Sequence, residues 1–420
     1  MIKEIRPSGA LHARIHVPGS KSITNRALIC ASLAQGESVI RNASDSDDTA
    51  LMVNGLNQLG VLVRKRDTGL VVEGNGGKLY APKFPIPVGN AGTTLRFLMA
   101  LGAIARGKVV FVGDQRMADR PIEDLLDALH MLGVEAAADG RISKCTVDGG
   151  SLRGGIAKVK GDKSSQFLSS LLMVSPYANQ DVTIEVEDKL TSQPYVDITV
   201  EVMKQFGICI RRSDHKRYEI TAGERYRPIE FNVDLDASTA GYFLAACAIA
   251  GGEVVIAGMR LKQLQGDIGF INILKEMGCE VEGHPDGLMV ESYRNLKGVD
   301  VDMNSMPDFV PTLGVVALFA KGETRIRNVA HLRYKESDRL EALATELKKV
   351  GADIALTEDG LNIRPVELHG AQLDTYDDHR LAMSFALIGL RVPGIKIENP
   401  NCVRKSFPSF WNEFEKLYAK

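Results

Sequence analysis

The sequence Leu347-Lys348-Lys349-Val350-Gly351 is typical of a helix end, because a glycine suits the left-handed position that follows a helix. It runs into Ala352–Thr357, then Glu358-Asp359-Gly360, then Leu361–Ile363. The first and last of these segments alternate as strands do, and aspartate followed by glycine favours a hairpin turn between them. This stretch therefore predicts a helix followed directly by a β-hairpin.

The same pattern recurs along the chain. Helix-like runs that end in glycine also lie at Leu56–Gly60, Leu129–Gly133, Met203–Gly207 and Leu274–Gly278. A second marker, an apolar helix leading into a small turn and a short strand, recurs out of phase with turns centred on Gly36, Gly107, Gln180, Gly252, Gly322 and Gly394. Both markers give a period of about 72 residues. We therefore predict six units, each reading strand, helix, strand, helix, strand, strand.

The sixth unit lacks its hairpin, because its last predicted helix, Pro408–Tyr418, lies at the end of the sequence. We expect the N-terminal segment Lys3–Val17, with its strand-like Ala13–Val17, to supply the missing strands. Three units in each lobe predict two similar domains, residues 1–19 plus 234–420 and residues 20–233, with crossings near 18–20 and 231–236. Equivalent helix starts in two facing lobes would meet at one cleft, where we expect the active site.

Composition excludes several classes of protein. The 420 residues carry a net charge of −2, which gives no general basic excess for binding nucleic acid or a membrane surface. The six cysteines form no metal-ligand pattern, and most have apolar neighbours, which indicates buried free thiols in a reducing compartment. No signal segment or membrane span is evident. We expect a soluble, cytoplasmic protein.

Gly89-Asn90-Ala91-Gly92 precedes a helix that we expect to begin near Gly92. Small residues there leave the first backbone N–H groups open, and such a helix end suits a phosphate or a carboxylate. The same four residues also suit a simple turn and helix cap. The motif alone does not decide between the two interpretations.

Cations recur at equivalent positions near predicted helix starts, namely Lys21, Arg120, Lys335, Arg380 and Lys405. A cation at a helix N-terminus is unfavourable by ~0.3–1 kcal/mol. Five such exceptions indicate an anionic ligand that offsets the cost. Asp47, Asp236 and Ser238, at other helix starts, are interpreted as ordinary N-caps.

These clusters resemble the motifs of the EPSP synthase (3-phosphoshikimate 1-carboxyvinyltransferase) family. The resemblance covers essentially the whole chain and rests, in order, on Val17–Arg26, Gly89–Thr94, Asp119-Arg120-Pro121, Ser164–Phe167, Arg333–Leu340 and Asp377–Arg380. It implies an α/β fold of two inside-out, barrel-like domains, each of three βαβαββ repeats. The implied reaction needs no metal or other cofactor. We expect a monomer, although the sequence leaves the oligomeric state open.

The implied reaction belongs to the shikimate pathway of aromatic amino-acid biosynthesis, which leads to chorismate. The enolpyruvyl group of phosphoenolpyruvate is transferred to the 5-hydroxyl of shikimate 3-phosphate by addition and elimination, and phosphate is released. Such a site needs proton carriers and strong anion binding. The only partners implied are these two small-molecule substrates.

The resemblance also implies which residues bind each substrate. It assigns to shikimate 3-phosphate Lys21, Ser22, Arg26, Ser164, Ser165, Gln166, Ser192, Tyr195, Asp308, His331 and Lys335. It assigns to phosphoenolpyruvate Lys21, Gly92, Thr93, Arg120, Gln166, Arg339, Arg380 and Lys405. Arginines suit bidentate capture of carboxylate and phosphate, whereas lysines act as point charges.

Four residues are candidates for catalysis: Lys21, Asp308, Glu336 and His379. We assign Asp308 as the base on the 5-hydroxyl and expect its apolar neighbours to raise its pKa. We assign Glu336 to protonation of the methylene carbon, although a surface i,i+3 pair with Arg339 is an alternative. His379 is expected to donate from the site wall. The sequence leaves the proton roles among Lys21, Asp308 and Glu336 open.

Three positions depart from many relatives. Phe97 replaces a proline, His331 an asparagine and Gln193 a lysine. Phe97 follows the Gly92–Arg96 run, so we expect it to alter the first turn of that helix, and sensitivity to the inhibitor glyphosate stays open. His331 is expected to change one contact to the substrate.

Two alternative functions remain. UDP-N-acetylglucosamine 1-carboxyvinyltransferase shares the fold and the donor, but it typically carries a reactive cysteine where this chain has the cysteine-free loop Gly113–Arg120. A non-catalytic two-lobed binding protein is disfavoured by the intact set of Lys21, Asp308, Glu336 and Arg380.

Overall fold

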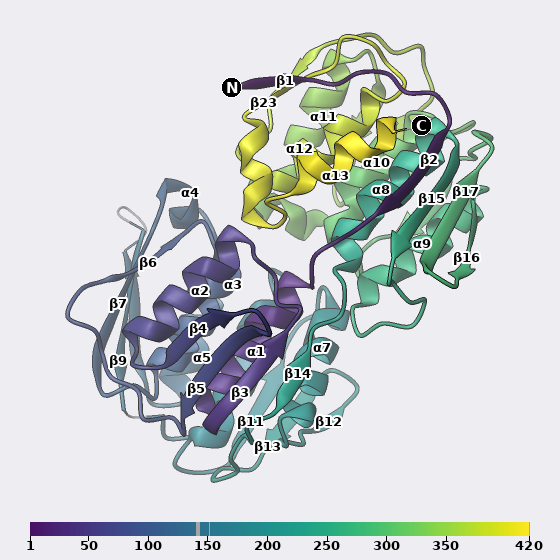
Figure 1. Ribbon diagram of the computed structural model, residues 1–420. Coiled ribbons are helices and arrows are strands. Elements are labelled where there is room, and N and C mark those ends of the chain that lie inside the picture. Colours follow the sequence, from purple (N-terminus) through teal and green to yellow (C-terminus); the bar gives the residue numbers. More distant parts are fainter. Residues whose placement is uncertain (140–142, 151, 420) are drawn as a thin grey trace. The chain divides into compact units, whose positions relative to one another are not determined.

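The computed structural model describes residues 1–139, 143–150 and 152–419. The chain divides into two compact units, one formed by Met1–Pro18 with Leu235–Lys420 and the other by Gly19–Asp234 (Figure 1). Each unit combines three β-sheets with helices, and the α/β class predicted from the sequence is confirmed.

In the Gly19–Asp234 unit, three four-stranded sheets share one topology, with strand orders β14-β3-β5-β4, β6-β7-β9-β8 and β10-β11-β13-β12. The first pair in each order is parallel, and the other pairs are antiparallel. The strands are β3 (Gln35–Arg41), β4 (Leu62–Arg66), β5 (Gly69–Asn75), β6 (Ile86–Gly89), β7 (Gly107–Gly113), β8 (Glu135–Asp139), β9 (Lys144–Gly149), β10 (Gly155–Val159), β11 (Val182–Val186), β12 (Arg211–Ser213), β13 (Arg217–Ile220) and β14 (Glu230–Asn232). The helices are α1 (Lys21–Leu33), α2 (Asp47–Gln58), α3 (Gly92–Gly102), α4 (Gln115–Ala118), α5 (Glu123–Met131), α6 (Ser165–Val174), the 3₁₀ turn η1 (Ser175–Tyr177) and α7 (Gln193–Gln205).

The other unit repeats this plan, with strand orders β2-β15-β17-β16 and β18-β19-β21-β20, and a three-stranded sheet β1-β23-β22. Its strands are β1 (Ile2–Glu4), β2 (Leu11–Ile15), β15 (Gly252–Ala257), β16 (Glu280–His284), β17 (Gly287–Ser292), β18 (Asp300–Asp302), β19 (Thr324–Arg327), β20 (Asp353–Leu356), β21 (Leu361–Arg364), β22 (Gln372–Leu373) and β23 (Lys396–Glu398). Its α-helices are α8 (Ala237–Ala250), α9 (Phe270–Glu276), α10 (Val310–Ala317), α11 (Arg339–Lys349), α12 (His379–Ile388) and α13 (Phe410–Glu415). Its 3₁₀ helices are η2 (Gly266–Gly269), η3 (Pro307–Phe309), η4 (Ala330–Tyr334), η5 (Pro400–Lys405) and η6 (Lys416–Tyr418).

The glycines that mark the repeat adopt the backbone conformation predicted for them. Gly60, Gly133, Gly207, Gly278 and Gly351 follow the second helix of five successive repeats, with φ between 81° and 109°. Only glycine enters this region at little cost. The prediction of repeated helix ends followed by hairpins is therefore confirmed.

The N-terminal strands are divided between two sheets, which corrects one prediction. β1 pairs antiparallel with β23 and completes the last sheet, as expected. β2, however, pairs parallel with β15, and Ile15 aligns with Ile256 (Figure 1). In the other unit β14 occupies the corresponding place beside β3. Alternating side chains identify a strand but not its partner, so the sequence could not assign β2 to its sheet.

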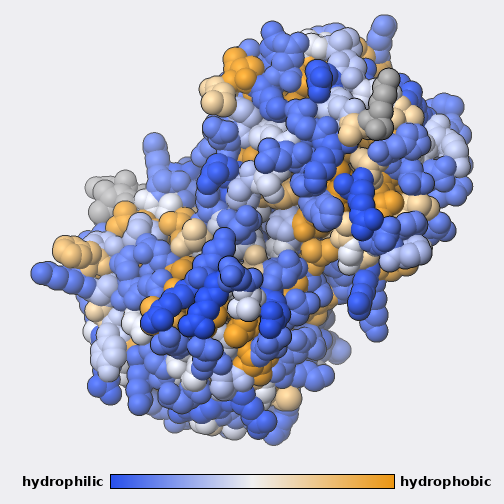
Figure 2. All heavy atoms as spheres, in the orientation of Figure 1, coloured by the Kyte–Doolittle hydropathy of each residue, from blue (hydrophilic) through white to orange (hydrophobic). Residues whose placement is uncertain are grey.

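The helices are of two kinds. Nearly every residue of α1, α3, α6, α8, α10 and α12 is buried, and these helices follow the first strand of each sheet's repeat. Helices such as α5 and α11 bury one face only. The visible surface is mostly hydrophilic, with small separate apolar patches (Figure 2). In the described part of the chain, no helix combines the length and apolar character that crossing a membrane requires.

Candidate active site

The substrate-binding and catalytic residues predicted from the sequence lie in both units. The Gly19–Asp234 unit contains Lys21, Ser22, Arg26, Gly92, Thr93, Arg120, Ser164, Ser165, Gln166, Ser192 and Tyr195. The other unit contains Asp308, His331, Lys335, Glu336, Arg339, His379, Arg380 and Lys405. Within each unit, hydrogen bonds join several of these residues to one another.

The start of α3 lacks a side-chain cap. Ala91 is the N-cap residue, and its methyl side chain cannot accept a hydrogen bond from the N–H groups of the helix. Asn90 instead binds Arg120, whose Nη1 donates to the backbone oxygen and to the Oδ1 of Asn90, each at 3.1 Å. The structure therefore favours the open helix end over the simple cap, and it places a guanidinium beside that end.

Arg96, in the second turn of α3, contacts α6 and the segment at Pro121. Its Nη1 donates to Oε1 of Gln166 at 2.8 Å, and its Nη2 donates to the backbone oxygen of Pro121 at 2.8 Å. Its guanidinium lies 5.1 Å from the ring centre of Phe167. Arg96 thus fixes Gln166 relative to the loop that carries Arg120. From the sequence alone, Arg96 had no assigned role.

Lys21 is the first residue of α1, and Ser20 caps the helix by accepting from the N–H of Ile23. Its Nζ lies 2.9 Å from Oδ2 of Asp48, and both side chains are largely buried. Asp48 is the second residue of α2, whose N-cap is Ser46 rather than the predicted Asp47. The lysine therefore has a carboxylate partner that the sequence did not reveal.

Arg26 is buried and its hydrogen bonds are made within the unit. Its guanidinium donates to the backbone oxygens of Ser22 at 2.8 Å and of Tyr195 at 3.0 Å, and to Oγ1 of Thr199 at 2.7 Å. Burial lowers its pKa to about 10. The ring of Phe97 lies 5.2 Å from the Arg26 guanidinium. Phe97 is a buried residue in the second turn of α3, and it packs against the arginine that joins α1 to α7 by hydrogen bonds.

The predicted serines lie at helix starts. Ser164 caps α6 by accepting from the N–H of Gln166 at 3.3 Å, and Ser165 is the first residue of that helix. Ser192 precedes α7 in the left-handed conformation, with φ of 54°. All three serines are buried, and the backbone of α6 holds the hydroxyl of Ser164.

In the other unit, Arg339 binds three carboxylates. Its Nε donates to Oδ2 of Asp378 at 2.8 Å, its Nη1 to Oδ1 of Asp308 at 2.9 Å and its Nη2 to Oε2 of Glu336 at 2.7 Å. We call these four residues the Arg339 cluster. The pair with Glu336 has the predicted i,i+3 spacing, but its side chains are only 1% and 12% exposed, so it is not a surface pair. Asp378 was missed as a separate site residue, although it lies inside a quoted motif.

Arg380 reaches the same cluster through Asp308. Its Nη2 lies 2.6 Å from Oδ2 of Asp308, and its Nη1 donates to the hydroxyl of Tyr242 at 3.4 Å. Burial raises the pKa of Asp308, but the charges of Arg380, Arg339 and Lys335 outweigh it and hold that pKa well below its usual range. The expectation of a raised pKa was wrong, because the apolar neighbours in sequence are not the nearest groups in space.

Two histidines lie beside these charges. His331 belongs to η4, and its Nε2 is buried without a hydrogen-bond partner among the described residues. Burial, with the charge of Lys335, lowers the pKa of His331 to about 3, so the ring is neutral at physiological pH. His379 begins α12, is 1% exposed and has its Nδ1 3.7 Å from Oδ1 of Asp378.

The cations do not all lie at helix starts, which corrects the prediction from spacing. Lys21 and Arg380 are in the first turn of α1 and α12. Arg120 and Lys335 precede α5 and α11 by a few residues, and Lys405 ends η5. Their common feature is therefore a place either in the first turn of a helix or in the segment that leads to one. The period of the repeat located these places but not the residue at which each helix begins.

The family of the chain follows from its sequence relatives. The model of the EPSP synthase (3-phosphoshikimate 1-carboxyvinyltransferase) family matches residues 5–414. A 3-phosphoshikimate 1-carboxyvinyltransferase from Trichormus variabilis is 41% identical over 412 residues, covering 97% of each chain. One from Shewanella loihica is 43% identical, covering 99% of this chain and 100% of the relative. The chain belongs to the EPSP synthase family. The prediction made from the six motifs is confirmed.

Solved structures agree with membership of the EPSP synthase family. EPSP synthase from Acinetobacter baumannii is 26% identical and has a TM-score of 0.82, with 99% of this chain and 98% of that chain covered. The enolpyruvyl transferase NikO from Streptomyces tendae has a TM-score of 0.79 over 99% of this chain and 97% of its own. At 18% identity, NikO shows a common fold only.

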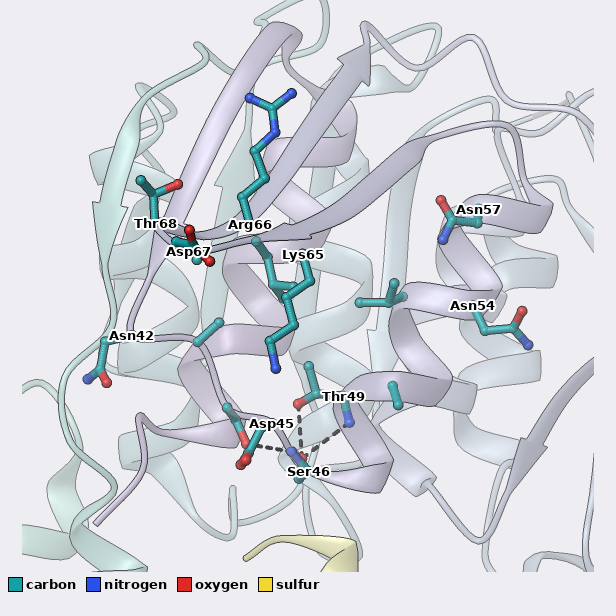
Figure 3. Close-up of a pocket in the computed structure, with 16 residues that line it drawn as sticks. Asn42, Asp45, Ser46, Thr49, Asn54, Asn57, Lys65, Arg66, Asp67 and Thr68 are labelled. Atoms are coloured by element: carbon teal, nitrogen blue, oxygen red, sulfur yellow. Dashed lines mark hydrogen bonds between the residues drawn. The ribbon is translucent and has the colours of Figure 1, made fainter. Parts of the chain in front are cut away.

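A pocket of about 600 Å³ lies elsewhere in the Gly19–Asp234 unit, between α2 and the β4–β5 hairpin (Figure 3). Its lining includes none of the predicted site residues. Lys65 points toward Asp45 and Thr49 at the start of α2, whereas Arg66 points away (Figure 3). The lining carries as many acidic as basic side chains (Asp45 and Asp67 against Lys65 and Arg66), so the charge of this pocket selects no class of ligand.

We predict that Gly92→Ala raises KM for phosphoenolpyruvate by about tenfold or more, with a smaller change in KM for shikimate 3-phosphate. A Cβ at Gly92 would lie 2.6 Å from the guanidinium atoms of both Arg120 and Arg96. Both guanidinia are hydrogen-bonded and largely buried, so they cannot move away freely. Steady-state kinetics with each substrate varied would measure the effect.

The matched control is Gly102→Ala in the same helix. A Cβ there meets only carbon atoms at 3.6 Å or more, which is ordinary contact. It should leave both KM values within about twofold of wild type. Equal effects of the two substitutions on phosphoenolpyruvate would contradict a role for the Gly92 surface in binding.

Proposed function

We propose that the protein catalyses the transfer of the enolpyruvyl group of phosphoenolpyruvate to the 5-hydroxyl of shikimate 3-phosphate. The observation that carries the proposal is the Arg339 cluster, in which one guanidinium holds Asp308 and Glu336, the two proposed proton carriers. Full-length relatives at 41–43% identity carry the corresponding enzyme name. They support this function over UDP-N-acetylglucosamine transfer and over a non-catalytic binding protein.

In the proposed addition, the substrate hydroxyl oxygen forms a bond to C2 of phosphoenolpyruvate and its proton passes to Asp308. Glu336 gives a proton to the methylene carbon, which becomes a methyl group. In the elimination, the methyl group returns a proton to the Glu336 carboxylate, the double bond re-forms and the phosphate leaves with the C–O bonding pair. Each step needs a positioned acid or base, and such groups contribute about 10²–10⁴-fold each to rate.

The charges around Asp308 suggest how it becomes a better base. In the free protein, Arg380, Arg339 and Lys335 hold its pKa low, so the carboxylate is ionised but weakly basic. An anionic substrate bound to Arg380 would neutralise part of that charge and raise the pKa of Asp308 toward its usual range. Substrate binding would thus increase the basicity of the group that accepts the proton.

The residues of the Gly19–Asp234 unit belong to the same proposal. Lys21, Arg120 and the open start of α3 suit the anionic groups of phosphoenolpyruvate, and the buried hydroxyls of Ser164 and Ser165 suit a hydroxylated ring and its phosphate. His331 offers a neutral ring nitrogen with hydrogen-bonding capacity, as a substrate hydroxyl requires. We propose that these residues and the Arg339 cluster act on the same two substrates.

We also propose that the protein is a monomer and is located in the cytoplasm. All six cysteines are unpaired, and Cys30, Cys145, Cys247 and Cys279 are buried, as expected of thiols in a reducing compartment.

A phosphate-release assay tests the function. With phosphoenolpyruvate and shikimate 3-phosphate, the purified protein should release phosphate at a kcat on the order of 1–10³ s⁻¹. With phosphoenolpyruvate and UDP-N-acetylglucosamine, or with phosphoenolpyruvate alone, release should stay at background. Release only with the nucleotide sugar would assign the protein to the other transferase, and no release with either acceptor would support a non-catalytic protein.

A further inference from the structure

The loop before α12 has an unusual backbone. Tyr376 and Asp377 both have positive φ, 51° and 56°, and neither is glycine. Each such residue costs about 1–3 kcal/mol, which surrounding contacts have to offset. The next residue is Asp378, which caps α12 and binds Arg339 through both carboxylate oxygens. The conformation of this loop therefore sets the position of the carboxylate on which the Arg339 cluster is built.

Glu346 supplies contacts that hold this loop. Its side chain is completely buried. Its Oε2 accepts from the backbone N–H of Asp374 at 2.9 Å, and its Oε1 accepts from the hydroxyl of Tyr376 at 2.9 Å. Lys349, partly exposed one turn later, lies 2.8 Å from the same carboxylate and balances its charge.

Arg339 and Glu346 both belong to α11 and are seven residues apart. That spacing places them on one face of a helix, about two turns from each other. Arg339 binds the end of the loop at Asp378, and Glu346 binds its beginning at Asp374 and Tyr376. One helix face therefore holds both ends of the segment Asp374–Asp378.

Other contacts also hold this loop. The N–H of Asp378 donates to the backbone oxygen of Thr375 at 2.7 Å and closes the turn that contains Tyr376 and Asp377. Oδ1 of Asp374 accepts from the N–H of Tyr376 at 2.8 Å, and Nδ2 of Asn399 donates to Oδ1 of Asp377 at 2.8 Å. Asn399 directly precedes η5, which ends at Lys405. None of these contacts involves the N–H of Asp374 or the hydroxyl of Tyr376, which only Glu346 binds among the described hydrogen bonds.

We propose that Glu346 is a positioning residue for the reaction: by holding Tyr376 and Asp377 in the left-handed conformation, it places Asp378 so that Arg339 orients Asp308 and Glu336. Glu346 itself touches none of the substrate-binding residues assigned above in any described hydrogen bond or ion pair. The inference rests on the proposed function, since its effect is measured on enolpyruvyl transfer.

Kinetics of three variants test the role. Glu346→Ala removes both loop contacts and should lower kcat about tenfold or more, while KM for each substrate changes less than about threefold. Glu346→Gln keeps one acceptor oxygen and should lie between Glu346→Ala and wild type. Tyr376→Phe removes a single hydroxyl contact on a partly exposed residue and should lower kcat about twofold to fivefold. The matched control is Glu341→Gln, the same change at an exposed position of α11, which should leave kcat within about twofold.

A rescue distinguishes positioning from general destabilisation. Asparagine enters the left-handed region more readily than tyrosine does. In the Glu346→Ala background, Tyr376→Asn should therefore restore kcat about threefold or more, since the hydroxyl contact is already lost there. General loss of stability predicts no such recovery.

The outcomes separate the two proposals. If wild-type protein shows no transfer, the proposed function fails. If wild type is active but Glu346→Ala and Glu346→Gln keep wild-type kcat, only the role of Glu346 is overturned. A loss confined to KM, or a fall in melting temperature without a fall in kcat, would also overturn it. Should Glu346→Ala not fold, Glu346→Gln and Tyr376→Phe decide by the same criteria.

Discussion

Arg339→Lys is expected to lower kcat/KM by about a thousandfold or more, although it keeps the positive charge. Arg339 binds Asp378, Asp308 and Glu336 with three different nitrogens. A lysine ammonium is a compact point charge and cannot match the planar guanidinium that spans three carboxylates. At least one proposed proton carrier would lose its position, and steady-state kinetics with both substrates would show the loss.

The same substitution should also destabilise the fold. The guanidinium is 1% exposed and Asp378 is fully buried, so a broken contact leaves a carboxylate without full compensation. Breaking a buried ion pair typically costs about 3–5 kcal/mol. Urea unfolding followed by circular dichroism would measure this difference, and kinetics should be run at temperatures where the variant remains folded.

Arg333→Lys is the matched control. Arg333 pairs with Asp338 at 3.0 Å only a few residues before Arg339, but both side chains are about one-third exposed. Exposed ion pairs contribute little to stability. We therefore expect kcat/KM to change by less than about twofold and the free energy of unfolding by less than about 1 kcal/mol. Comparable losses in both variants would show that any arginine in this segment is needed for folding, and the specific role of Arg339 would be lost.

The sequence predicted the repeat well for a physical reason. Gly60, Gly133, Gly207, Gly278 and Gly351 mark helix ends through a backbone conformation that depends on local chemistry alone. Five equally spaced copies of that local signal define the period, and the period defines the units. The pairing of strands is not such a local signal. β2 can be recognised as a strand, but its neighbour in the sheet, β15, lies far away in the sequence. Strand pairing over that distance depends on how the whole unit packs.

The charged residues of the candidate site could be named from the sequence for a similar reason. Motifs around Lys21, Arg120, Arg339 and Arg380 carry the charges, so their residues could be named from the sequence. The carboxylate partners were harder to find. Asp48 and Asp378 meet their cations only in the folded chain, Lys21 with Asp48 and Arg339 with Asp378. Asp308 shows the consequence: its sequence neighbours are apolar, but two arginines from other elements set its pKa.

Asp308→Asn is expected to lower kcat by about 10²–10⁴-fold, as loss of a general base does. The substitution keeps the size of the side chain and an oxygen that can still accept from Arg380 or Arg339. It removes the charge and the ability to take a proton. Because the carboxylate repels anions, affinity for phosphoenolpyruvate should be unchanged or higher. Single-turnover measurements and isothermal titration would separate these two effects.

The stability that the Asp308 carboxylate gives to wild type should depend on pH in a defined direction. The pKa of Asp308 is lowered in the folded protein from an ordinary value of 3.8, so its pairing stabilises the fold above that pH. The stabilisation is lost as the pH falls below 3.8 toward the lower folded value. The difference in unfolding free energy between wild type and Asp308→Asn should therefore be constant at neutral pH and shrink on acidification through about pH 4.

Asp353→Asn supplies the control, since Asp353 is exposed on β20 and lies 3.6 Å from an exposed arginine, Arg364. Its kcat should stay within about twofold of wild type. Wild-type turnover by Asp308→Asn at saturating substrates would contradict its role as the base and would leave Lys21 or Glu336 to accept the proton. Weaker phosphoenolpyruvate binding with normal turnover would instead show that Asp308 acts only by holding Arg380 and Arg339 in place.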